Sequence, residues 1–558
     1  MANRSGPEFL VNTTYLLEQS LSEVTGLTNG RFVVTWQDLS QTGGDTNGYA
    51  TRARIFNADG TRFGAEILVN TTTASYQIDP DITALADGRF LIVWTDFSAS
   101  GGDTSSNAVR GQLFNANGNK SGIEFVVNTT TTGPQNEANV TTLKNGGFVV
   151  SWTDQSHTGG DAFGAAVYVQ VFDAGGAKLG VEQRVNTSTF GDQGQSEVTA
   201  LKNGGFVVTW TDYQEALDDP SIYAVRMRVY NASGTALSGQ LLINTTTIGQ
   251  QFDPEITALT NGRFVVTWTD GSGVDGHLDK AIRAQVFNAD GSVRGAEFAV
   301  NTTSDFDQID PTVTALAGGR FVIAWKDSSQ TGDDTSLSAV RAQVFNANGT
   351  KSGAEFVVCT TVLGAQFEPS LSTLADGRFV VSWTDFSQTF GDVSGFAVRG
   401  QIFDARRAAI TLNGTAAADD YLGITFADVL NGAAGADNLS GAGGNDTIGG
   451  GGGADTLQGG TGQDGLTGGT GADLFLFVTA LRTDQDTITD FAHLTDHIDL
   501  SSFMSGGSFI AAGPFTAANQ VRYNAATGVQ QGDVGGGGTN WTLTLTNLPT
   551  LTAADFIH

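Results

Sequence analysis

Short runs in which apolar and polar residues alternate fill the first four hundred residues of the chain. In one such run Phe264, Val266 and Trp268 share one face, while Val265 and Thr267 share the other. Alternation over roughly four to eight residues predicts a β-strand. Apolar side chains on both faces indicate sheets that are stacked against other sheets. No helical period interrupts the pattern, so we predict an all-β fold.

Tryptophan marks a seven-fold repeat of this pattern. Trp36, Trp94, Trp152, Trp210, Trp268, Trp325 and Trp383 are spaced by 58 residues, with one interval of 57. Each copy contains four strand-like runs, which in the sixth copy are 297–302, 311–316, 320–325 and 339–345. Pairs such as Asn29-Gly30 lie between consecutive runs and favour two-residue hairpin turns. Seven four-stranded antiparallel units predict a seven-bladed β-propeller over residues 1–405, with an open solenoid as the alternative.

The two ends of the repeat distinguish a ring from a solenoid. The last copy stops at Asp404 without a fourth strand, whereas the chain begins with an isolated strand-like run at 8–13. We expect strand 8–13 to complete blade seven and close the ring, because closure removes an exposed sheet edge.

Nine-residue repeats of another kind occupy residues 432–476. An aspartate recurs every nine residues, a glycine stands two residues before it, and an apolar residue stands two residues after it. Glycine permits tight bends, the carboxylate offers a hard oxygen, and the apolar residue points inward from a short strand. We therefore predict a parallel β-roll over 406–476, in which Asp437, Asp455 and Asp473 line one edge. The candidate metal-binding residues are Gly435, Asp437, Gly444, Asp446, Gly453, Asp455, Gly462, Asp464, Gly471 and Asp473.

Two looser copies, 414–422 and 423–431, extend this register upstream through Asp419 and Asp428. A flexible glycine-rich linker is the alternative interpretation of such a composition. Five copies in strict register argue against it.

From Asn413 onward the chain resembles the C-terminal part of RTX proteins, such as the serralysin-type proteases. The resemblance rests on the nonapeptides, on 486–491 and 496–500, and on the tail 551–558. It implies Ca2+ as the bound ion, folding outside the cell, and a type I export signal within a β-rich region at 477–558. The type I export machinery would then be a partner. No proteolysis is implied, because a propeller stands where the protease module would be.

Charge and cysteine content narrow the choice of partners and compartment. The chain carries 58 acidic and 28 basic residues, a formal net charge of -30, which disfavours nucleic acid and anionic membranes as partners. The single cysteine, Cys359, excludes an internal disulfide framework. Without a long apolar run we expect no transmembrane segment, and residues 1–14 do not resemble a signal peptide. The calcium motif nevertheless favours a secreted, extracellular or surface-associated bacterial protein, because weak calcium sites stay empty in the cytosol.

Two sets of polar residues are candidate ligand-binding positions on the propeller. The first set consists of aspartates at the end of the loop between the second and third strands. Alternatively, these carboxylates accept hydrogen bonds from backbone amides of the same loop. The second set is a glutamine before the innermost strand, followed two residues later by an acid; its alternative role is a hydrogen bond to the neighbouring blade's backbone. The sets are Asp45, Asp103, Asp161, Asp334 and Asp392, and Gln77, Gln135, Gln251, Gln308 and Gln366. A recurring Trp-x-Asp with an arginine on the third strand predicts a buried ion pair that sets blade register.

No catalytic motif of a metalloprotease, a serine hydrolase or a phosphate-binding loop is present, so we assign no catalytic residue. The sequence favours a secreted calcium-binding protein whose propeller is a multivalent, adhesin- or lectin-like module for polysaccharide or another cell-surface ligand. The alternatives are a glycan-active hydrolase or lyase that uses carboxylates at the channel mouth, and a structural surface-layer or matrix protein.

Overall fold

The computed structural model describes residues 2–103, 105–158, 160, 163–214, 218–274, 279–331, 337–361, 363–389, 395–478, 485–504, 506–533 and 541–557. The chain forms two compact units, one of Met1–Leu27 with Phe32–Ala405 and one of Thr28–Arg31 with Arg406–His558. Within the described ranges every element is a strand except two short 3-10 turns, η2 (Ala317–Gly319) and η3 (Ala553–Asp555). Over that part of the chain there is no helix of the length and apolarity needed to cross a membrane.

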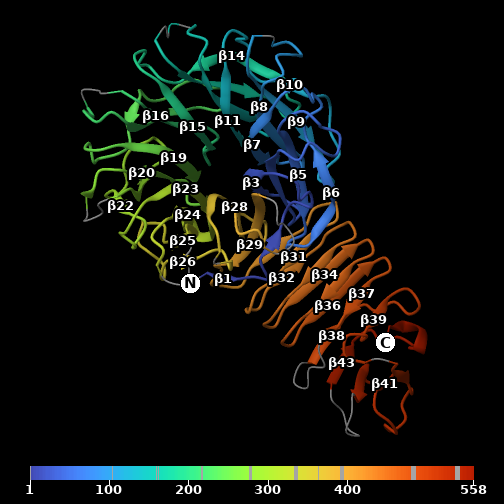
Figure 1. The fold of residues 1–558 in the computed structure, drawn as a ribbon. Helices are drawn as coiled ribbons and strands as arrows, with labels where there is room; N and C mark the ends of the chain where they lie inside the picture. The colour runs from blue at the N-terminus through green and yellow to red at the C-terminus, as the bar shows by residue number, and fades with distance from the viewer. Residues whose placement is uncertain are drawn as a thin grey trace. The chain divides into compact units, whose positions relative to one another are not determined.

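The first unit consists of seven antiparallel sheets (Figure 1). The innermost strands are β3 (Gln19–Gly26), β7 (Gln77–Ala84), β11 (Gln135–Thr142), β15 (Gln193–Ala200), β19 (Gln251–Ala258), β23 (Gln308–Ala315) and β27 (Gln366–Thr373). The second strands are β4 (Phe32–Asp38), β8 (Phe90–Asp96), β12 (Phe148–Asp154), β16 (Phe206–Asp212), β20 (Phe264–Asp270), β24 (Phe321–Asp327) and β28 (Phe379–Asp385). The third strands are β5 (Ala50–Phe56), β9 (Ala108–Phe114), β13 (Ala166–Phe172), β17 (Ala224–Tyr230), β21 (Ala281–Phe287), β25 (Ala339–Phe345) and β29 (Ala397–Asp404).

The outer strands are shorter than the sequence predicts in most blades. They are β6 (Arg62–Leu68), β10 (Phe125–Val126), β14 (Lys178–Arg184), β18 (Leu241–Leu242), β22 (Phe298–Ala299) and β26 (Phe356–Val357), with β1 (Asn3–Arg4) and β2 (Phe9–Leu10) in the seventh blade. Each innermost strand contacts the innermost strand of the next blade, and β27 contacts β3. The ring is therefore closed, and the first unit is a seven-bladed β-propeller.

The seventh blade is completed by the start of the chain. β2 pairs antiparallel with β29, so that Phe9 lies opposite Gly400, and β1 pairs with the end of the same strand. The run expected to form one strand over 8–13 thus forms the two-residue β2, and β1 was not foreseen. Val11, which follows β2, is fully buried in the core between blades seven and one.

A repeated clamp joins each outer strand to its neighbouring blade. Glu8 accepts hydrogen bonds from the backbone N–H of Thr360 at 2.7 Å and from its hydroxyl at 2.6 Å. Equivalent contacts recur around the ring at Glu66, Glu124, Glu182, Gln240, Glu297 and Glu355. Each contact links residues about 53 apart in sequence, or 352 for Glu8, so the clamp ties separate blades together.

Apolar side chains fill the space between blades, which explains why the second strands are apolar on both faces. The cluster around Trp36 combines Val24 and Phe32 of blade one with Val380 and Val398 of blade seven. The seven repeat tryptophans have no exposed surface. Truncation of such a residue to alanine typically costs about 3–5 kcal/mol, so this layer is a major source of propeller stability.

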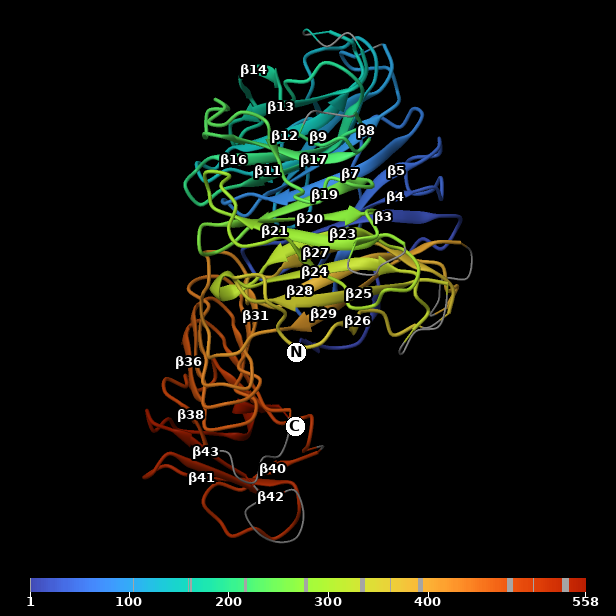
Figure 2. The ribbon, with the colours of Figure 1, turned by 90° about the vertical axis from the view of Figure 1, so that its left-hand side faces the viewer.

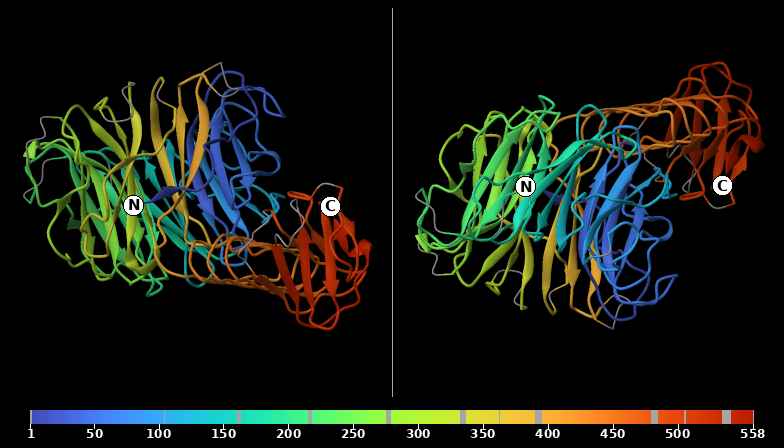
Figure 3. Two further views of the ribbon diagram at one scale, coloured as in Figure 1. Left: turned by 90° about the horizontal axis from the view of Figure 1, so that it is seen from below. Right: turned by 90° about the horizontal axis from the view of Figure 1, so that it is seen from above.

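The second unit is a parallel β-roll (Figure 3). One sheet contains β30 (Thr411–Asn413), β32 (Val429–Asn431), β34 (Thr447–Gly452), β36 (Gly465–Thr470) and β38 (Gln485–Ile488). The other contains β31 (Asp420–Leu422), β33 (Asn438–Ser440), β35 (Thr456–Gln458), β37 (Leu474–Leu476) and β39 (His497–Asp499). Consecutive strands alternate between the two sheets, and paired residues such as Leu439 and Leu457 are one coil apart.

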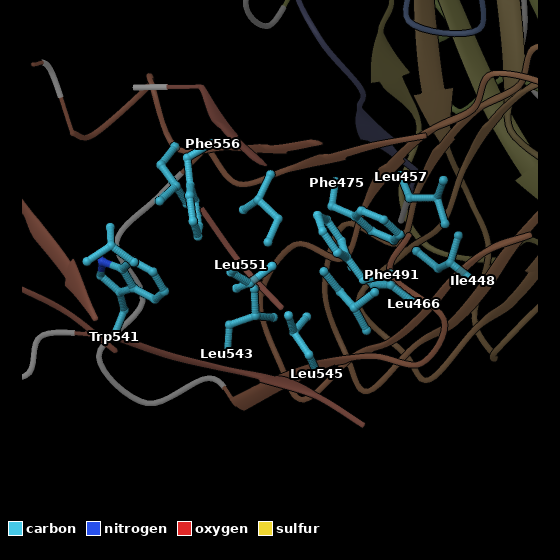
Figure 4. Close-up of a cluster of buried hydrophobic side chains, with 14 of the residues drawn as sticks. Ile448, Leu457, Leu466, Phe475, Phe491, Trp541, Leu543, Leu545, Leu551 and Phe556 are labelled. Carbon is cyan, nitrogen blue, oxygen red and sulfur yellow. The ribbon is translucent and has the colours of Figure 1, made fainter. Parts of the chain in front are cut away.

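The roll continues past residue 476, where the regular nonapeptides end. β38 pairs in parallel with β43 (Trp541–Leu545), and β39 pairs in parallel with β44 (Phe556–Ile557). The first sheet continues beyond β43 through β42 (Val529–Asp533) and β41 (Gln520–Asn524), which are antiparallel neighbours, to β40 (Ser508–Phe509), which pairs in parallel with β41 (Figure 2). One buried core runs from the nonapeptide residues Ile448, Leu457 and Leu466 to Leu545 and Phe556 (Figure 4). The core and the strand pairing are therefore continuous across residue 476, where we expected the C-terminal region to begin.

Candidate metal centre and channel mouth

The loop aspartates predicted to form peripheral ligand sites are buried where the structure describes them. Asp45 accepts a hydrogen bond from the Asn47 backbone at 3.1 Å and from the Asn70 amide at 2.8 Å. Asp103 has the same two kinds of partner, and both side chains are 1% exposed. These carboxylates therefore cap their own loops, which is the alternative that the sequence left open. Asp161, Asp334 and Asp392 lie outside the described residues.

The predicted ligand-binding glutamines are also internal. Gln77 donates a hydrogen bond to Asp96 on its own blade at 3.1 Å and accepts one from Asn70 of the preceding blade at 3.1 Å. Gln135, Gln251, Gln308 and Gln366 occupy the equivalent positions and, like Gln77, have no exposed surface. The partner across the blade boundary is a side-chain amide rather than the backbone that we expected. The glutamines are therefore internal residues that link neighbouring blades.

The buried ion pairs predicted from Trp-x-Asp are present in six blades. Arg52, Arg110, Arg226, Arg283, Arg341 and Arg399 pair with the aspartate of the second strand at 2.5 to 2.9 Å. In blade three Tyr168 stands in place of the arginine, and Asp154 keeps a buried oxygen without a hydrogen-bond partner. Burial raises the pKa of Asp154 there. Removal of one partner of such a pair would leave a buried charge without a counter-charge. Only the observed register of the second and third strands brings the two partners together, so these pairs fix the blade register.

A ring of side chains surrounds the channel where the innermost strands begin, on what we call the mouth face. The ring consists of Leu21, Asp79, Glu137, Gln195, Asp253, Asp310 and Glu368. All seven residues have a left-handed φ between +49° and +55°, at a β-bulge that recurs in every blade. Non-glycine residues held in this region are strained, and such strain often aims side chains at functional sites.

Hydrogen bonds and repulsion connect the members of this mouth ring. Gln195 donates to Asp253 through its side-chain amide, and its carbonyl oxygen accepts a hydrogen bond from the Tyr213 hydroxyl at 2.6 Å. Burial, with repulsion from Glu137, raises the pKa of Asp79 to about 6. Burial, with repulsion from Asp310, raises the pKa of Asp253 to about 7. The ring is one connected site in which some carboxylates can hold protons near neutral pH.

Aromatic side chains and lysines flank the same ring. The Lys280 amine lies 5.8 Å from the ring centre of Phe252, and the Lys326 amine lies 5.8 Å from that of Phe367. The Tyr213 and Tyr223 rings pack edge-on with their centres 4.9 Å apart. The loops that lead into the innermost strands expose further apolar side chains, including Leu16, Phe190, Ile248, Phe306 and Leu363. The mouth face thus combines hydrogen-bonding groups with flat apolar surfaces.

Two residues further along the innermost strands, four carboxylates face the channel. They are Glu23, Asp81, Glu197 and Glu255, and uncharged Asn139, Thr312 and Ser370 occupy the position in the other blades. Ser370 donates a hydrogen bond to Glu23 at 2.6 Å, and the Val140 backbone donates one to Asp81 at 2.6 Å. Burial and mutual repulsion raise the pKa of Glu23 to about 8 and burial raises that of Asp81 to about 7; the pKa values of Glu197 and Glu255 are also well above their usual range.

These shifts predict how propeller stability depends on pH. Because the folded pKa of Glu23, about 8, lies above its ordinary value of 4.5, the folded state binds more protons than the unfolded state between these values. Stability is therefore greatest below that window and falls as pH rises through it. We expect Glu23→Gln to raise the melting temperature of the propeller by several degrees at about pH 9 and to change it little at about pH 5.

Thermal melts followed by near-ultraviolet circular dichroism would measure this difference. Asp290→Asn is a matched control, because Asp290 lies exposed in a turn and its carboxylate is bound by Ser292 of the same turn. An equal shift for Glu23→Gln at both pH values would contradict the argument from protonation.

The nonapeptide aspartates form two ladders along the edges of the roll. The backbone N–H of Asp437 donates to Oδ1 of Asp455 at 2.9 Å, and that of Asp455 donates to Oδ1 of Asp473 at 3.0 Å. On the other edge the backbone N–H of Asp446 donates to Oδ1 of Asp464 at 2.8 Å. The division into two edges that the nine-residue spacing predicts is confirmed.

The second carboxylate oxygen of four nonapeptide aspartates has no hydrogen-bond partner. Oδ2 of Asp437, Asp446, Asp455 and Asp473 is buried and accepts no hydrogen bond, and each of these side chains is only 1–2% exposed. A buried carboxylate without compensation is costly. Burial accordingly raises the pKa of Asp437 to about 6 and that of Asp446 to about 7. These four oxygens are where a cation would be most stabilising.

Glycine sets the shape of each turn. Gly453 has φ +140°, and a β-carbon at this position would overlap the carbonyl oxygen of Gly435, one coil earlier. φ lies between +111° and +143° at the other predicted glycines, which are Gly435, Gly444, Gly462 and Gly471. Backbone carbonyls of successive turns therefore stack closely. Carboxylate and carbonyl oxygens at a glycine-rich turn are the ligands that Ca2+ prefers, so the residues present fit that ion.

Side chains alone would not complete a site. Among the described residues no three acidic, histidine or cysteine side chains come together as a metal-binding group. The ladder geometry accounts for this, because the carboxylates stand in single file along each edge. Carbonyl oxygens of the turns would have to supply the remaining ligands.

A comparison with protein-family models identifies this stretch. The RTX calcium-binding nonapeptide repeat matches residues 413–448, 422–457 and 449–476. The second unit carries RTX repeats. The match includes the two looser RTX copies that contain Asp419 and Asp428, and it ends where the roll loses its nine-residue spacing.

No curated protein sequence matches the chain. Similar solved structures include a protein of unknown function from Dyadobacter fermentans, with 11% identity, 73% of this chain and 99% of that chain covered, and a TM-score of 0.40. A polysaccharide lyase described as an ulvan lyase has 10% identity, 70% and 97% coverage, and a TM-score of 0.43. An α-L-arabinofuranosidase from Fusarium graminearum has 13% identity, 72% and 97% coverage, and a TM-score of 0.38. Identities and scores this low carry no information about substrate.

The RTX ladders extend to aspartates that the nine-residue spacing does not reach. The backbone N–H of Asp464 donates to Asp486 at 3.0 Å, and that of Asp473 donates to Asp496 at 3.1 Å. These steps span 22 and 23 residues in place of 18. The resemblance to RTX proteins included both aspartates in its motifs but gave them no place in the ladders. Only the parallel pairing of β36 with β38 and of β37 with β39 shows their position.

Proposed function

We propose that this protein binds calcium through its RTX roll and works outside the cell. The observation that carries the proposal is the row of four buried Oδ2 atoms that accept no hydrogen bond, at Asp437, Asp446, Asp455 and Asp473. Without an ion the roll must bury these charges uncompensated, which opposes folding. With Ca2+ the same charges become favourable contacts, so that binding and folding are coupled.

The need for calcium supports the extracellular location. Extracellular calcium modules bind in the range of about 10⁻⁴–10⁻³ M, so such sites fill outside the cell and stay empty in the cytosol. A chain whose roll is unfolded without calcium is suited to export in an unfolded state. Type I export remains part of the proposal and is supported by the likeness of the RTX region to secreted proteins of that class.

We further propose that the propeller binds a glycan at the mouth face. Glycans present hydroxyl groups to acceptors and flat apolar faces to aromatic rings. The mouth ring offers carboxylates and the Gln195 amide, while Tyr213, Tyr223 and Phe252 lie beside it. Because the described peripheral loop aspartates are internal caps, we favour one central site over seven peripheral ones. Binding of a repetitive surface polysaccharide would give the adhesin- or lectin-like function.

Catalysis on a glycan is the second candidate, and a specific observation favours it. Asp79, with a pKa near 6, and Asp253, with a pKa near 7, lie in the same ring as the carboxylates of Glu137, Asp310 and Glu368. Hydrolysis of a glycosidic bond uses a pair of carboxyl groups of which one holds a proton. The Tyr213 hydroxyl, whose pKa burial and nearby carboxylates raise above the usual range, stays protonated beside Gln195.

Calcium removal should affect the two units differently. On addition of excess chelator we expect the roll to lose its β-sheet signal while the propeller keeps its tryptophan packing. The reason is that the row of buried carboxylate oxygens without a hydrogen bond, at Asp437, Asp446, Asp455 and Asp473, lies in the roll, whereas the described part of the propeller has one such oxygen, on Asp154. Far-ultraviolet circular dichroism reports on both units, and tryptophan fluorescence reports mainly on the propeller, because seven of the eight tryptophans lie in it. Unchanged circular dichroism on chelation would contradict calcium-dependent folding.

A polysaccharide panel tests the mouth face in the presence of calcium. We expect binding by the wild type, at least a tenfold weaker affinity for Asp253→Asn, and unchanged affinity for the control Asp290→Asn on the opposite side of the disc. If the wild type releases oligosaccharides and Asp253→Asn does not, the result would support catalysis rather than binding alone. Wild-type affinity in Asp253→Asn and in Glu137→Gln would exclude the mouth ring as the binding site.

A further inference from the structure

Eight of the nine aspartates described in the two RTX ladders, all but Asp486, fall into two classes. Asp419, Asp428 and Asp496 occupy ladder positions, because their Oδ1 atoms or backbone amides continue the same hydrogen-bond chains. Unlike Asp437, Asp446, Asp455 and Asp473, each of them also has a hydrogen-bond partner for Oδ2. The partner is the backbone N–H four residues earlier: Thr415 for Asp419 at 2.6 Å, Ile424 for Asp428 at 2.6 Å and Ala492 for Asp496 at 2.7 Å.

Backbone conformation at that fourth preceding residue separates the classes. In the five open turns the residue has a left-handed φ, and its N–H does not bond the carboxylate. These residues are Ala433 at +73°, Ala442 at +67°, Gly451 at +102°, Gly460 at +102° and Gly469 at +99°. Thr415 and Ile424 are β-branched and rarely adopt that region, and neither they nor Ala492 do so here. Their N–H groups consequently turn toward the carboxylate.

The residue two positions before the aspartate also differs between the open and the closed turns. The open turns carry the glycine discussed above two residues before the aspartate, whereas the turns of Asp419 and Asp428 carry Ala417 and Phe426. Neither residue has a positive φ. These two turns therefore cannot adopt the backbone of an open turn. In both looser copies, replacement of this glycine therefore goes with a turn that binds its own aspartate.

We infer that only the five open turns take calcium, and that the turns of Asp419, Asp428 and Asp496 are ends of the roll that close without an ion. An N–H group directed at the carboxylate places the positive end of a dipole where the cation would sit, and it already compensates the buried charge. At the far end Asp490 accepts hydrogen bonds from the amides of Gly468 and Gly469, in the open turn of Asp473, at 2.9 and 2.7 Å. The calcium-dependent segment is thus bracketed by turns whose carboxylates need no metal.

The inference rests on calcium binding by the RTX roll, and the number of ions bound per full-length chain tests it. We expect Asp455→Asn, at an open turn, to bind at least a whole ion fewer than the wild type in equilibrium dialysis. Asp428→Asn, at a closed turn, should bind the wild-type number. A whole ion lost from Asp428→Asn would overturn the inference, whereas a wild type that binds no calcium would overturn the proposed function itself.

A gain-of-site variant provides a test that does not depend on loss of a carboxylate. The double substitution Ile424→Gly with Phe426→Gly gives the closed turn of Asp428 the two glycines of an open turn. We expect this chain to bind more calcium ions than the wild type and to show a larger calcium-induced change in circular dichroism. A folded double variant that binds no additional ion would count against the role of these two positions.

Discussion

Gly453→Ala is expected to abolish calcium-induced folding of the roll. A β-carbon at this residue overlaps the carbonyl oxygen of Gly435, and φ +140° is a conformation that side-chain-bearing residues rarely adopt. Both obstacles involve backbone atoms, so rotation of a side chain cannot relieve them. The stacked turns above and below must move apart, which separates the Oδ2 atoms of Asp437 and Asp455 from the carbonyls that would share an ion with them.

A titration with calcium, followed by far-ultraviolet circular dichroism and by hydrodynamic radius, measures this effect. Gly449→Ala is the matched control within the same repeats, because its β-carbon would meet only the Asn431 side chain, at 3.8 Å, with no positive φ to maintain. We expect the control to compact with calcium as the wild type does. If Gly453→Ala compacted at the same calcium concentration, the turns would not require the backbone stacking described here.

Deletion of residues 2–12 is expected to lower propeller stability substantially. The deletion removes β1 and β2, the buried Val11, and Phe9, which packs against Phe32 and Phe56 with ring centres 6.0 and 5.2 Å away. Burial of two such apolar side chains contributes roughly 3–6 kcal/mol. The deletion also removes Glu8, and with it the ion pair to Arg399 and the hydrogen bond from the Thr360 backbone that joins blades six and seven.

The same deletion exposes the edge of β29, so we also expect self-association. Differential scanning calorimetry in saturating calcium, with size-exclusion chromatography, measures both effects. Leu16→Ala serves as the control, since Leu16 is 59% exposed in the loop that follows the deleted segment. An unchanged melting temperature and a monomeric profile for the deletion would show that the ring is closed by other contacts.

Much of the fold could be predicted because it depends on local periodicity. The two-residue alternation, the regular tryptophan spacing and the Asn-Gly pairs are sufficient for seven four-stranded blades. The nine-residue aspartate spacing is sufficient for two ladders, with Asp437 and Asp455 on one edge and Asp446 on the other. Recurrence alone did not reveal the role of each polar residue. Asp45 and Gln77 recur just as mouth-ring residues do, yet the fold buries them as caps and blade links.

The sequence by itself determined the number of blades and the roll, because these follow from residue spacing and from the conformational freedom of glycine. Only the tertiary structure decided which carboxylates are open. Asp428 and Asp446 share the same nine-residue register, but one accepts the Ile424 amide and the other keeps a buried oxygen without a hydrogen-bond partner. The physical reason is that hydrogen-bond satisfaction depends on the φ of a residue four positions away and on the coil stacked next to it. Irregular spacing likewise hid Asp486 and Asp496 until strand pairing placed them in the ladders.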